Sequence, residues 1–331
     1  MGVSSIARAA LVICIMLALI FNSATCIFGC SKGIDLCIKS VIPALFPFLV
    51  LSPLLTGFMP FKLPCWLRKT LKIPNGGDNL WITGCLGGYP VGAQCIAQAA
   101  QTGQISKADA RRLMAFCCNC GPGFIFGICS SFFVEKWAAW ALWLCHIAGS
   151  GIIGWIIPGN QDQGNVSFSA PKISVVDAFG KALKAMAQIC GWVILFRCLL
   201  ELLQHLGIGN LSAPVRVIIL GMLELTNGCL YLKLITNEAL RFLICEALLC
   251  FGGLCVAMQT ASVTNKIPLD LYLPGKIGQS IISTMLSAIV WASIHSQWHL
   301  VICITVPLVI FLTSIKVIFK KYSRNLCPAG V

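Results

Sequence analysis

Two hydrophobic stretches, one in each half of the chain, are interrupted by glycine, proline and polar residues. Residues 87–93 read Gly-Gly-Tyr-Pro-Val-Gly-Ala, and residues 224–228 read Glu-Leu-Thr-Asn-Gly. Each half carries a further break, at residues 119–123 and at residues 252–253. An ordinary membrane anchor gains nothing from such breaks, because hydrocarbon penalises every unpaired backbone group. Paired breaks in two repeats are instead typical of the binding site of a secondary transporter.

Pro90 and Pro122 each follow a glycine-rich break. Proline is well tolerated at the first position of a helix, where its missing N–H costs no hydrogen bond. Each proline is therefore predicted to start a half-helix whose free N–H groups point into the protein. Such an end carries about half a positive charge and favours an anion, such as a carboxylate. The alternative is that glycine and proline only permit close packing or a kink; two such motifs in a repeat favour the binding site.

Glu224 lies inside an apolar segment, beside Thr226 and Asn227. An intramembrane carboxylate is costly and is a functional hypothesis by default. It would carry a coupling proton, bind Na⁺ with its two polar neighbours, or pair with Arg197. A purely structural ion pair or helix contact is the alternative. We predict a coupling or gating role for Glu224.

Polar and glycine residues at the breaks are predicted to form the substrate site, although one polar residue alone is more often a contact between helices. The run Cys117-Cys118-Asn119-Cys120 lacks a second cysteine or histidine pair at ligand spacing, so no metal and no cofactor are predicted. No P-loop, Gly-x-Ser-x-Gly or His-Glu-x-x-His motif occurs, so an enzyme is not expected. The predicted substrate-binding residues are Gly88, Tyr89, Pro90, Gly92, Gln94, Asn119, Gly121, Pro122, Thr226, Asn227 and Gly228.

The composition is that of a polytopic membrane protein. The 331 residues are 58% hydrophobic and 11% charged, whereas soluble domains have about 25% charged residues. The net charge of +13 does not indicate nucleic acid binding, because most Lys and Arg lie between hydrophobic segments, where they set topology. The 20 cysteines are scattered through apolar segments and are expected to be reduced and buried as small hydrophobes.

Basic residues indicate that two of the hydrophobic segments do not cross the lipid bilayer. If every segment spans, Lys and Arg divide almost evenly between the two sides. If 81–101 and 214–236 are re-entrant hairpins, the split becomes seventeen to six, as the positive-inside rule requires. In that count Lys276 lies in a loop on the inner side. The segments are 6–28, 35–57, 81–101, 111–133, 137–158, 180–204, 214–236, 240–260, 277–297 and 299–319.

The predicted fold is an all-α membrane protein with about eight transmembrane helices and two re-entrant or broken helical hairpins. Gly84 precedes the first broken segment and Gly221 the second, and the two halves would be inverted repeats. Residues 1–331 would form a single membrane domain, with both termini in the cytoplasm. Its parts are the first repeat, 30–158, the second repeat, 172–297, and the last helix with a basic cytoplasmic tail, 298–331.

The same breaks carry a family resemblance. The stretches concerned are residues 42–48 (Ile-Pro-Ala-Leu-Phe-Pro-Phe), 88–93, 116–127 and 224–228. Through them, over about residues 30–260, the chain resembles the sporulation integral membrane protein YlbJ family (also called SpoVV), within the nucleoside-recognition or Gate-domain membrane proteins. The resemblance implies a protein of the bacterial cytoplasmic membrane, in the outer forespore membrane that derives from the mother cell. It also implies movement of dipicolinic acid toward the developing spore.

Three residues depart from the family pattern. Gln94 stands where a lysine is expected, and Cys118 and Cys120 stand where asparagine and serine are expected. These differences remove a cation and two strong hydrogen-bonding groups, so they bear on the substrate rather than on the architecture.

Three functions follow from these features. The first is a secondary transporter or facilitator of a small organic anion, most simply dipicolinate, coupled to H⁺ or Na⁺. The second is transport of a nucleoside or related metabolite on the same scaffold, which is favoured if Glu224 faces the ligand. The third is a non-transporting membrane scaffold for spore envelope assembly. The oligomeric state is left open, and a homo-oligomer is compatible with the sequence.

Overall fold

The computed structural model describes residues 5–58, 62–74, 77–159, 174–205, 207–264 and 267–326. Every regular element in these ranges is helical, so the predicted all-α class is confirmed. Six stretches are long and apolar enough to cross a membrane, and the expected total of about eight stays a prediction. The six stretches are Ser23–Leu55, Trp137–Ile156, Val175–His205, Glu238–Thr264, Tyr272–Ile294 and Trp298–Phe319.

The predicted hydrophobic segments are divided differently in the structure. Segment 6–28 is split near Asn22, where α1 (Ser5–Phe21) ends and α2 (Ser23–Leu36) begins. A π-helical stretch, η1 (Cys37–Val41), joins α2 to α3 (Ile42–Phe58). The predicted break in 111–133 separates α7 (Lys107–Met114) from α8 (Pro122–Gly127). Short elements complete the loops: α4 (Cys65–Leu71), η2 (Cys129–Phe132), η3 (Ile208–Asn210) and η4 (Leu232–Leu234).

Two helical hairpins occupy the segments that were predicted to be re-entrant. The first pairs α5 (Asp78–Gly87) with α6 (Val91–Gln101), and the second pairs α11 (Ala213–Leu223) with α12 (Leu225–Tyr231). The second break separates α13 (Glu238–Phe251) from α14 (Gly253–Thr264) at Gly252, whose φ of +78° favours glycine. Both broken helices therefore lie where the sequence predicts them.

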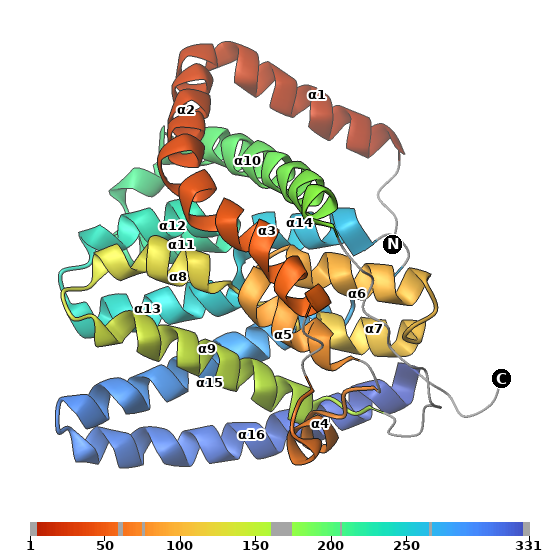
Figure 1. Ribbon diagram of the computed structural model, residues 1–331. Coiled ribbons are helices and arrows are strands. Elements are labelled where there is room, and N and C mark those ends of the chain that lie inside the picture. The colour runs from red at the N-terminus through yellow and green to blue at the C-terminus, as the bar shows by residue number, and fades with distance from the viewer. Residues whose placement is uncertain are drawn as a thin grey trace.

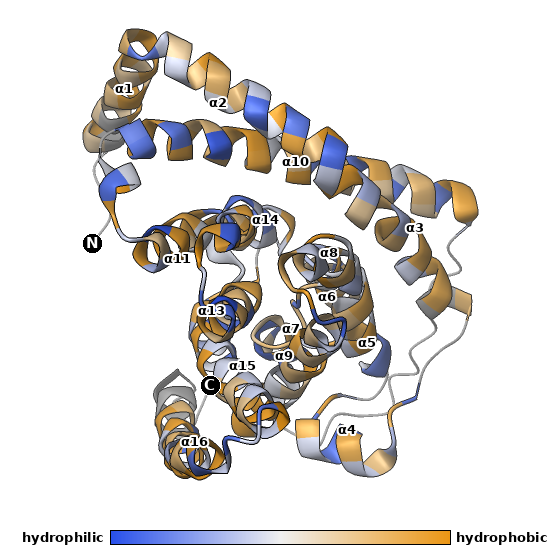
Figure 2. Cartoon of the chain, turned by 90° about the vertical axis from the view of Figure 1, so that its left-hand side faces the viewer, coloured by the Kyte–Doolittle hydropathy of each residue, from blue (hydrophilic) through white to orange (hydrophobic). Residues whose placement is uncertain are grey.

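The helices form two packed groups (Figure 1). One group contains the hairpins, the broken helices, α9 (Trp137–Ile156) and α15 (Tyr272–Ile294), with α16 (Trp298–Leu326) along its edge. In the other group, α2 and α3 cross α10 (Val175–His205), and Figure 2 shows these three helices along one side of the molecule. This α2–α3–α10 layer has its own hydrophobic core.

Glycines close both hairpins. A Cβ atom on Gly92 would lie 3.0 Å from the Gly84 Cα atom and 2.4 Å from the Cys117 carbonyl oxygen. A Cβ atom on Gly228 would lie 2.1 Å from the Gly221 Cα atom. Real Cβ atoms essentially never come within 3.0 Å of another atom, so glycine is needed where Gly228 meets Gly221 and where Gly92 meets the Cys117 carbonyl. Close packing is thus part of what the glycine-rich breaks do.

An ion pair joins the last turn of α7 to the loop before α15. The Arg111 guanidinium donates to Asp270 Oδ1 at 2.6 Å and also contacts Oδ2. The hydrogen bonds and charge of Arg111 hold the pKa of Asp270 below its ordinary value.

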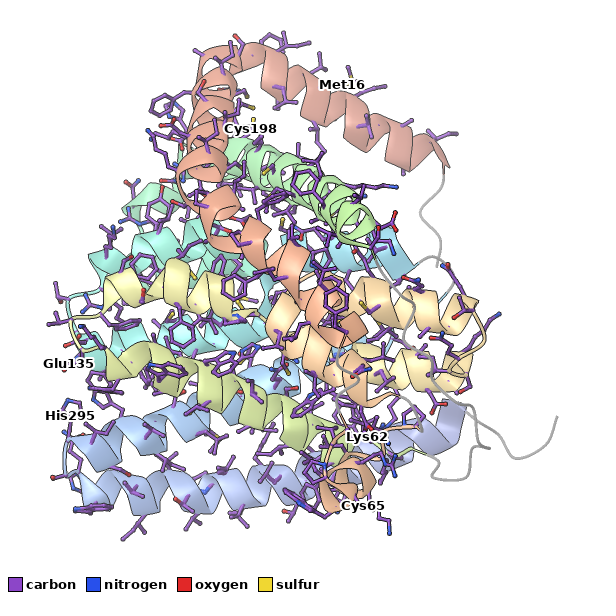
Figure 3. The ribbon with its side chains drawn as sticks, viewed as in Figure 1. Met16, Lys62, Cys65, Glu135, Cys198 and His295 are labelled. Atoms are coloured by element: carbon purple, nitrogen blue, oxygen red, sulfur yellow. The ribbon has the colours of Figure 1, made fainter. Side chains whose placement is uncertain are left out.

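Lys62 and Cys65 lie at one end of the molecule, and Glu135 and His295 lie at the opposite end (Figure 3).

Gly228→Ala should destabilise the protein, because the added methyl group cannot fit against Gly221. Overpacking of this kind costs about 1–3 kcal/mol, measured as a lower thermal unfolding midpoint in detergent. Gly180→Ala is the matched control, since a Cβ atom there meets nothing within 4 Å on helix α10. Equal midpoints for the two variants would contradict the packing described for the second hairpin.

Asp270→Asn should lower the free energy of unfolding at neutral pH by up to about 1 kcal/mol. Because the folded-state pKa of Asp270 is lowered, this stabilisation is present above the ordinary value of 3.8 and is lost as the pH falls through the lowered value. The unfolding midpoints of variant and wild type should therefore converge in acid. Asp35→Asn removes the ion pair between Asp35 and Lys39. This substitution should have a smaller effect, because the Asp35 side chain is 63% exposed. A difference for Asp270→Asn that persists in strong acid would contradict this assignment.

Candidate functional site

One pocket is bounded by both hairpin tips, the α7–α8 break and the α2–α3–α10 layer. The pocket has a volume of about 40 Å³. The structure thus brings the breaks of both halves to one place. The lining residues are Leu45, Leu49, Gly87, Gly88, Tyr89, Cys120, Gly121, Phe124, Ile189, Val193, Glu224, Leu225, Thr226, Val256 and Gln259.

Glu224 caps the half-helix α12 at the second hairpin tip. Its backbone is extended (φ −143°, ψ 117°), which ends α11 and lets the chain turn back. Its Oε1 accepts from the Thr226 N–H at 3.0 Å, and its Oε2 accepts from the Asn227 N–H and side-chain amide at 2.6 Å each. The carboxylate therefore satisfies the positive end of its own helix. The coupling or gating role stays a prediction.

Asn227 connects this cap to the α2–α3–α10 layer. Its side-chain oxygen accepts from Arg197 at 2.9 Å, and Arg197 also donates to Glu201 at 2.8 Å. Arg197 is only 7% exposed. It contacts Glu224 through Asn227, whereas direct pairing was one of the predicted alternatives. A polar chain thus links α10 to the second hairpin.

In the first half, Tyr89 lies at the hairpin tip and Asn119 lies in the α7–α8 break. Both side chains form hydrogen bonds there. The Tyr89 hydroxyl lies 3.4 Å from the carbonyl oxygens of Leu249 and Cys250, so the first hairpin contacts the second broken helix. The Asn119 side chain donates to the Phe116 carbonyl at 2.8 Å and to Ser150 at 3.1 Å. Asn119 is therefore committed to shaping the break.

The predicted site residues fall into two sets. Gly88, Tyr89, Gly121, Glu224 and Thr226 line the pocket. The others lie outside its lining: Pro90, Gly92, Gln94, Asn119, Pro122, Asn227 and Gly228. Helix α8 begins at Pro122, as predicted, whereas Pro90 comes just before the first residue of α6. Whether either set binds substrate stays a prediction.

A buried polar cluster beside Tyr89 was not among the predicted site residues. Lys276 was expected in a loop, but α15 begins at Tyr272 and Lys276 is fully buried within it. Gln279 lies one turn further along and donates to Asn119 at 3.0 Å. The signal for these residues was their spacing of three, which puts both on one face of an apolar helix.

One group of three side chains could share a metal ion, and no other such group occurs in the described ranges. The three residues are His146, Glu246 and Cys250. Their metal-binding atoms lie within 4.8 Å of one another, and all three residues are buried. His146 Nε2 accepts from the Cys120 N–H at 3.0 Å, which puts the ring proton on Nδ1, facing Cys250 at 3.1 Å. The Cys250 thiol donates to Glu246 at 3.3 Å. This tautomer leaves no Nδ1 lone pair for an ion, so the trio fits a hydrogen-bonded relay.

Comparison with known proteins supports one family. The chain is 24% identical, over 326 aligned positions, to "Sporulation integral membrane protein YlbJ" of Bacillus subtilis (strain 168), covering 82% of this chain and 79% of the relative. No family model matches the chain, and no solved structure matches it. The similarity supports the YlbJ family, as the motifs predicted. With the apolar helices, it supports an integral membrane protein.

Glu224→Ala should destabilise the second hairpin, because it leaves three buried donors at the start of α12 without their acceptor. The expected cost is roughly 1–3 kcal/mol, measured as a lower thermal unfolding midpoint. Glu135→Ala, at an exposed position, is the control and should change stability by less than about 0.5 kcal/mol. Equal stability of the two variants would show that the cap does not hold the hairpin.

Proposed function

We propose that the protein is a secondary transporter or facilitator that moves a small organic solute through the pocket between the two hairpin tips. The observation that carries the proposal is that broken segments from both halves line one pocket. Transporters bind solutes at such discontinuous helices, near the membrane midplane. An anchor or scaffold has no need of two breaks that meet in its interior.

We further propose that the two halves are inverted repeats. The support is the order of elements, since each half has a long helix, a hairpin, a broken helix and an unbroken helix. The first half supplies α2–α3, α5–α6, α7–α8 and α9, and the second supplies α10, α11–α12, α13–α14 and α15. The hairpins open toward opposite ends of the molecule (Figure 1), and each closes on a pair of glycines.

A role in sporulation is proposed from the relative's printed name. We place the protein in the outer forespore membrane, with both termini in the cytoplasm. Dipicolinate is the first candidate solute, because the family resemblance implies it. The pocket has a volume of only about 40 Å³, so it must widen to admit an aromatic dicarboxylate.

Glu224 favours a second candidate. Its carboxylate lines the pocket, and a carboxylate repels an anionic solute while accepting hydrogen bonds from hydroxyl groups. A nucleoside or similar metabolite would use that acceptor directly. Glu224 accepts three hydrogen bonds from its own hairpin. These hydrogen bonds lower the repulsion between the carboxylate and an anionic solute, so an anion remains the first candidate.

Proteoliposomes should take up labelled dipicolinate saturably, under an imposed proton or Na⁺ gradient. Uptake should fall at least about tenfold, equivalent to 1.4 kcal/mol, in Glu224→Gln and in Asn227→Ala, which alter the cap and its link to Arg197. Glu135→Gln, at an exposed position, should leave uptake unchanged.

No uptake above that of empty liposomes, with folded protein, would reject dipicolinate. Saturable uptake of labelled uridine in the same vesicles would then support the nucleoside alternative. Failure with both solutes would leave the scaffold role.

A further inference from the structure

A lysine ammonium lies in the interior, close to the ends of both broken helices. Lys276 is 0% exposed. None of the ion pairs found in the described ranges includes it. A buried charge is costly unless other groups compensate it, so the surroundings of this ammonium decide what it can do.

Three oxygen acceptors surround the Lys276 ammonium, and two of them come from distant parts of the chain. The ammonium donates to the Cys118 carbonyl, to Gln279 Oε1 at 2.7 Å and to the Tyr89 hydroxyl at 3.3 Å. The Nζ atom also lies 5.3 Å from the centre of the Tyr89 ring, within cation–π range. An ammonium has three donors, so none remains for a solute in the pocket.

These acceptors lead to both helix breaks. Cys118 lies in the stretch between α7 and α8. The Tyr89 hydroxyl faces the carbonyl oxygens of Leu249 and Cys250, in the last turn of α13. Last-turn carbonyls lack partners within their helix, and a helix C-terminus carries partial negative charge. The Lys276 ammonium donates to a carbonyl at the first break, and the Tyr89 hydroxyl donates to carbonyls at the second.

The charged form of Lys276 fits this arrangement. A neutral amine has two N–H groups and would take its third hydrogen bond from the Tyr89 O–H. The carbonyl oxygens of Leu249 and Cys250 would then lose that proton. As an ammonium, Lys276 donates to Tyr89, and the Tyr89 proton remains available to α13.

Unwound carbonyls and the C-terminal ends of half-helices are the groups with which secondary transporters coordinate Na⁺. We infer that Lys276 is a built-in cation that takes the place of a coupling Na⁺ at the first break. The broken helices then stay joined without a bound metal ion. This inference rests on the proposed function for one consequence, that transport does not depend on a Na⁺ gradient. Its main test does not require transport.

The test is thermal unfolding of the full-length protein in detergent, in NaCl, KCl and choline chloride at equal concentration. Wild type should have the same midpoint in all three salts. Lys276→Ser removes the ammonium and leaves the oxygen acceptors, so Na⁺ should raise its midpoint by at least about 2 °C over choline. Lys276→Met fills the space with an apolar chain, so it should be destabilised in every salt, with no response to Na⁺.

A Na⁺-specific rise of the wild-type midpoint would overturn the inference, as would a folded Lys276→Ser variant that ignores Na⁺. If Lys276→Ser cannot be purified in any salt, the wild-type comparison decides: equal midpoints support the built-in cation, and a Na⁺-specific rise rejects it. Uptake of labelled dipicolinate is measured separately with and without Na⁺. Absence of uptake would count against the proposed function and would leave the unfolding result intact.

Discussion

Every backbone group that is freed at a helix break must find a partner inside the protein, because the membrane interior offers no water. Two buried charges meet this requirement with opposite signs. The Glu224 carboxylate accepts from the N–H groups that begin α12, and the Lys276 ammonium donates to a carbonyl after α7. Glu224 lies at the N-terminus of α12, whose partial positive charge it balances, and Lys276 balances a freed carbonyl in the stretch between α7 and α8. The breaks are stable because the chain carries its own counter-charges.

This constraint also explains why the pocket lies where it does. The hairpins close tightly through their glycines, and the pocket lies where their tips meet the α2–α3–α10 layer. That layer contributes apolar side chains, such as Leu49 and Val193, whereas the hairpins contribute backbone, Tyr89 and Glu224. The Arg197–Asn227 hydrogen bond crosses the same boundary. A solute in the pocket would therefore contact both groups of helices.

The sequence predicted the breaks and the helical class because glycine, proline and buried charge have strong local meanings. The start of α8 at Pro122 and the hairpins at Gly84 and Gly221 follow from such local rules. Lys276 was misplaced because a positive charge at the edge of an apolar segment looks like a loop residue. Two of its three acceptors, the Tyr89 hydroxyl and the Cys118 carbonyl, come from distant parts of the chain. The spacing of Lys276 and Gln279 on one helix is therefore the one local pattern that marks the cluster.

Uptake by a variant whose pocket is filled would show whether the solute passes through the pocket. Val193 lines the pocket and is 1% exposed, whereas Leu195, two residues further along α10, is 49% exposed. Uptake of labelled dipicolinate would be compared for Val193→Phe and Leu195→Phe, once their thermal unfolding midpoints have been shown to be similar. If the solute passes through this pocket, uptake should be lost in Val193→Phe and retained in Leu195→Phe. Undiminished uptake by a folded Val193→Phe variant would show that the solute does not pass through this pocket.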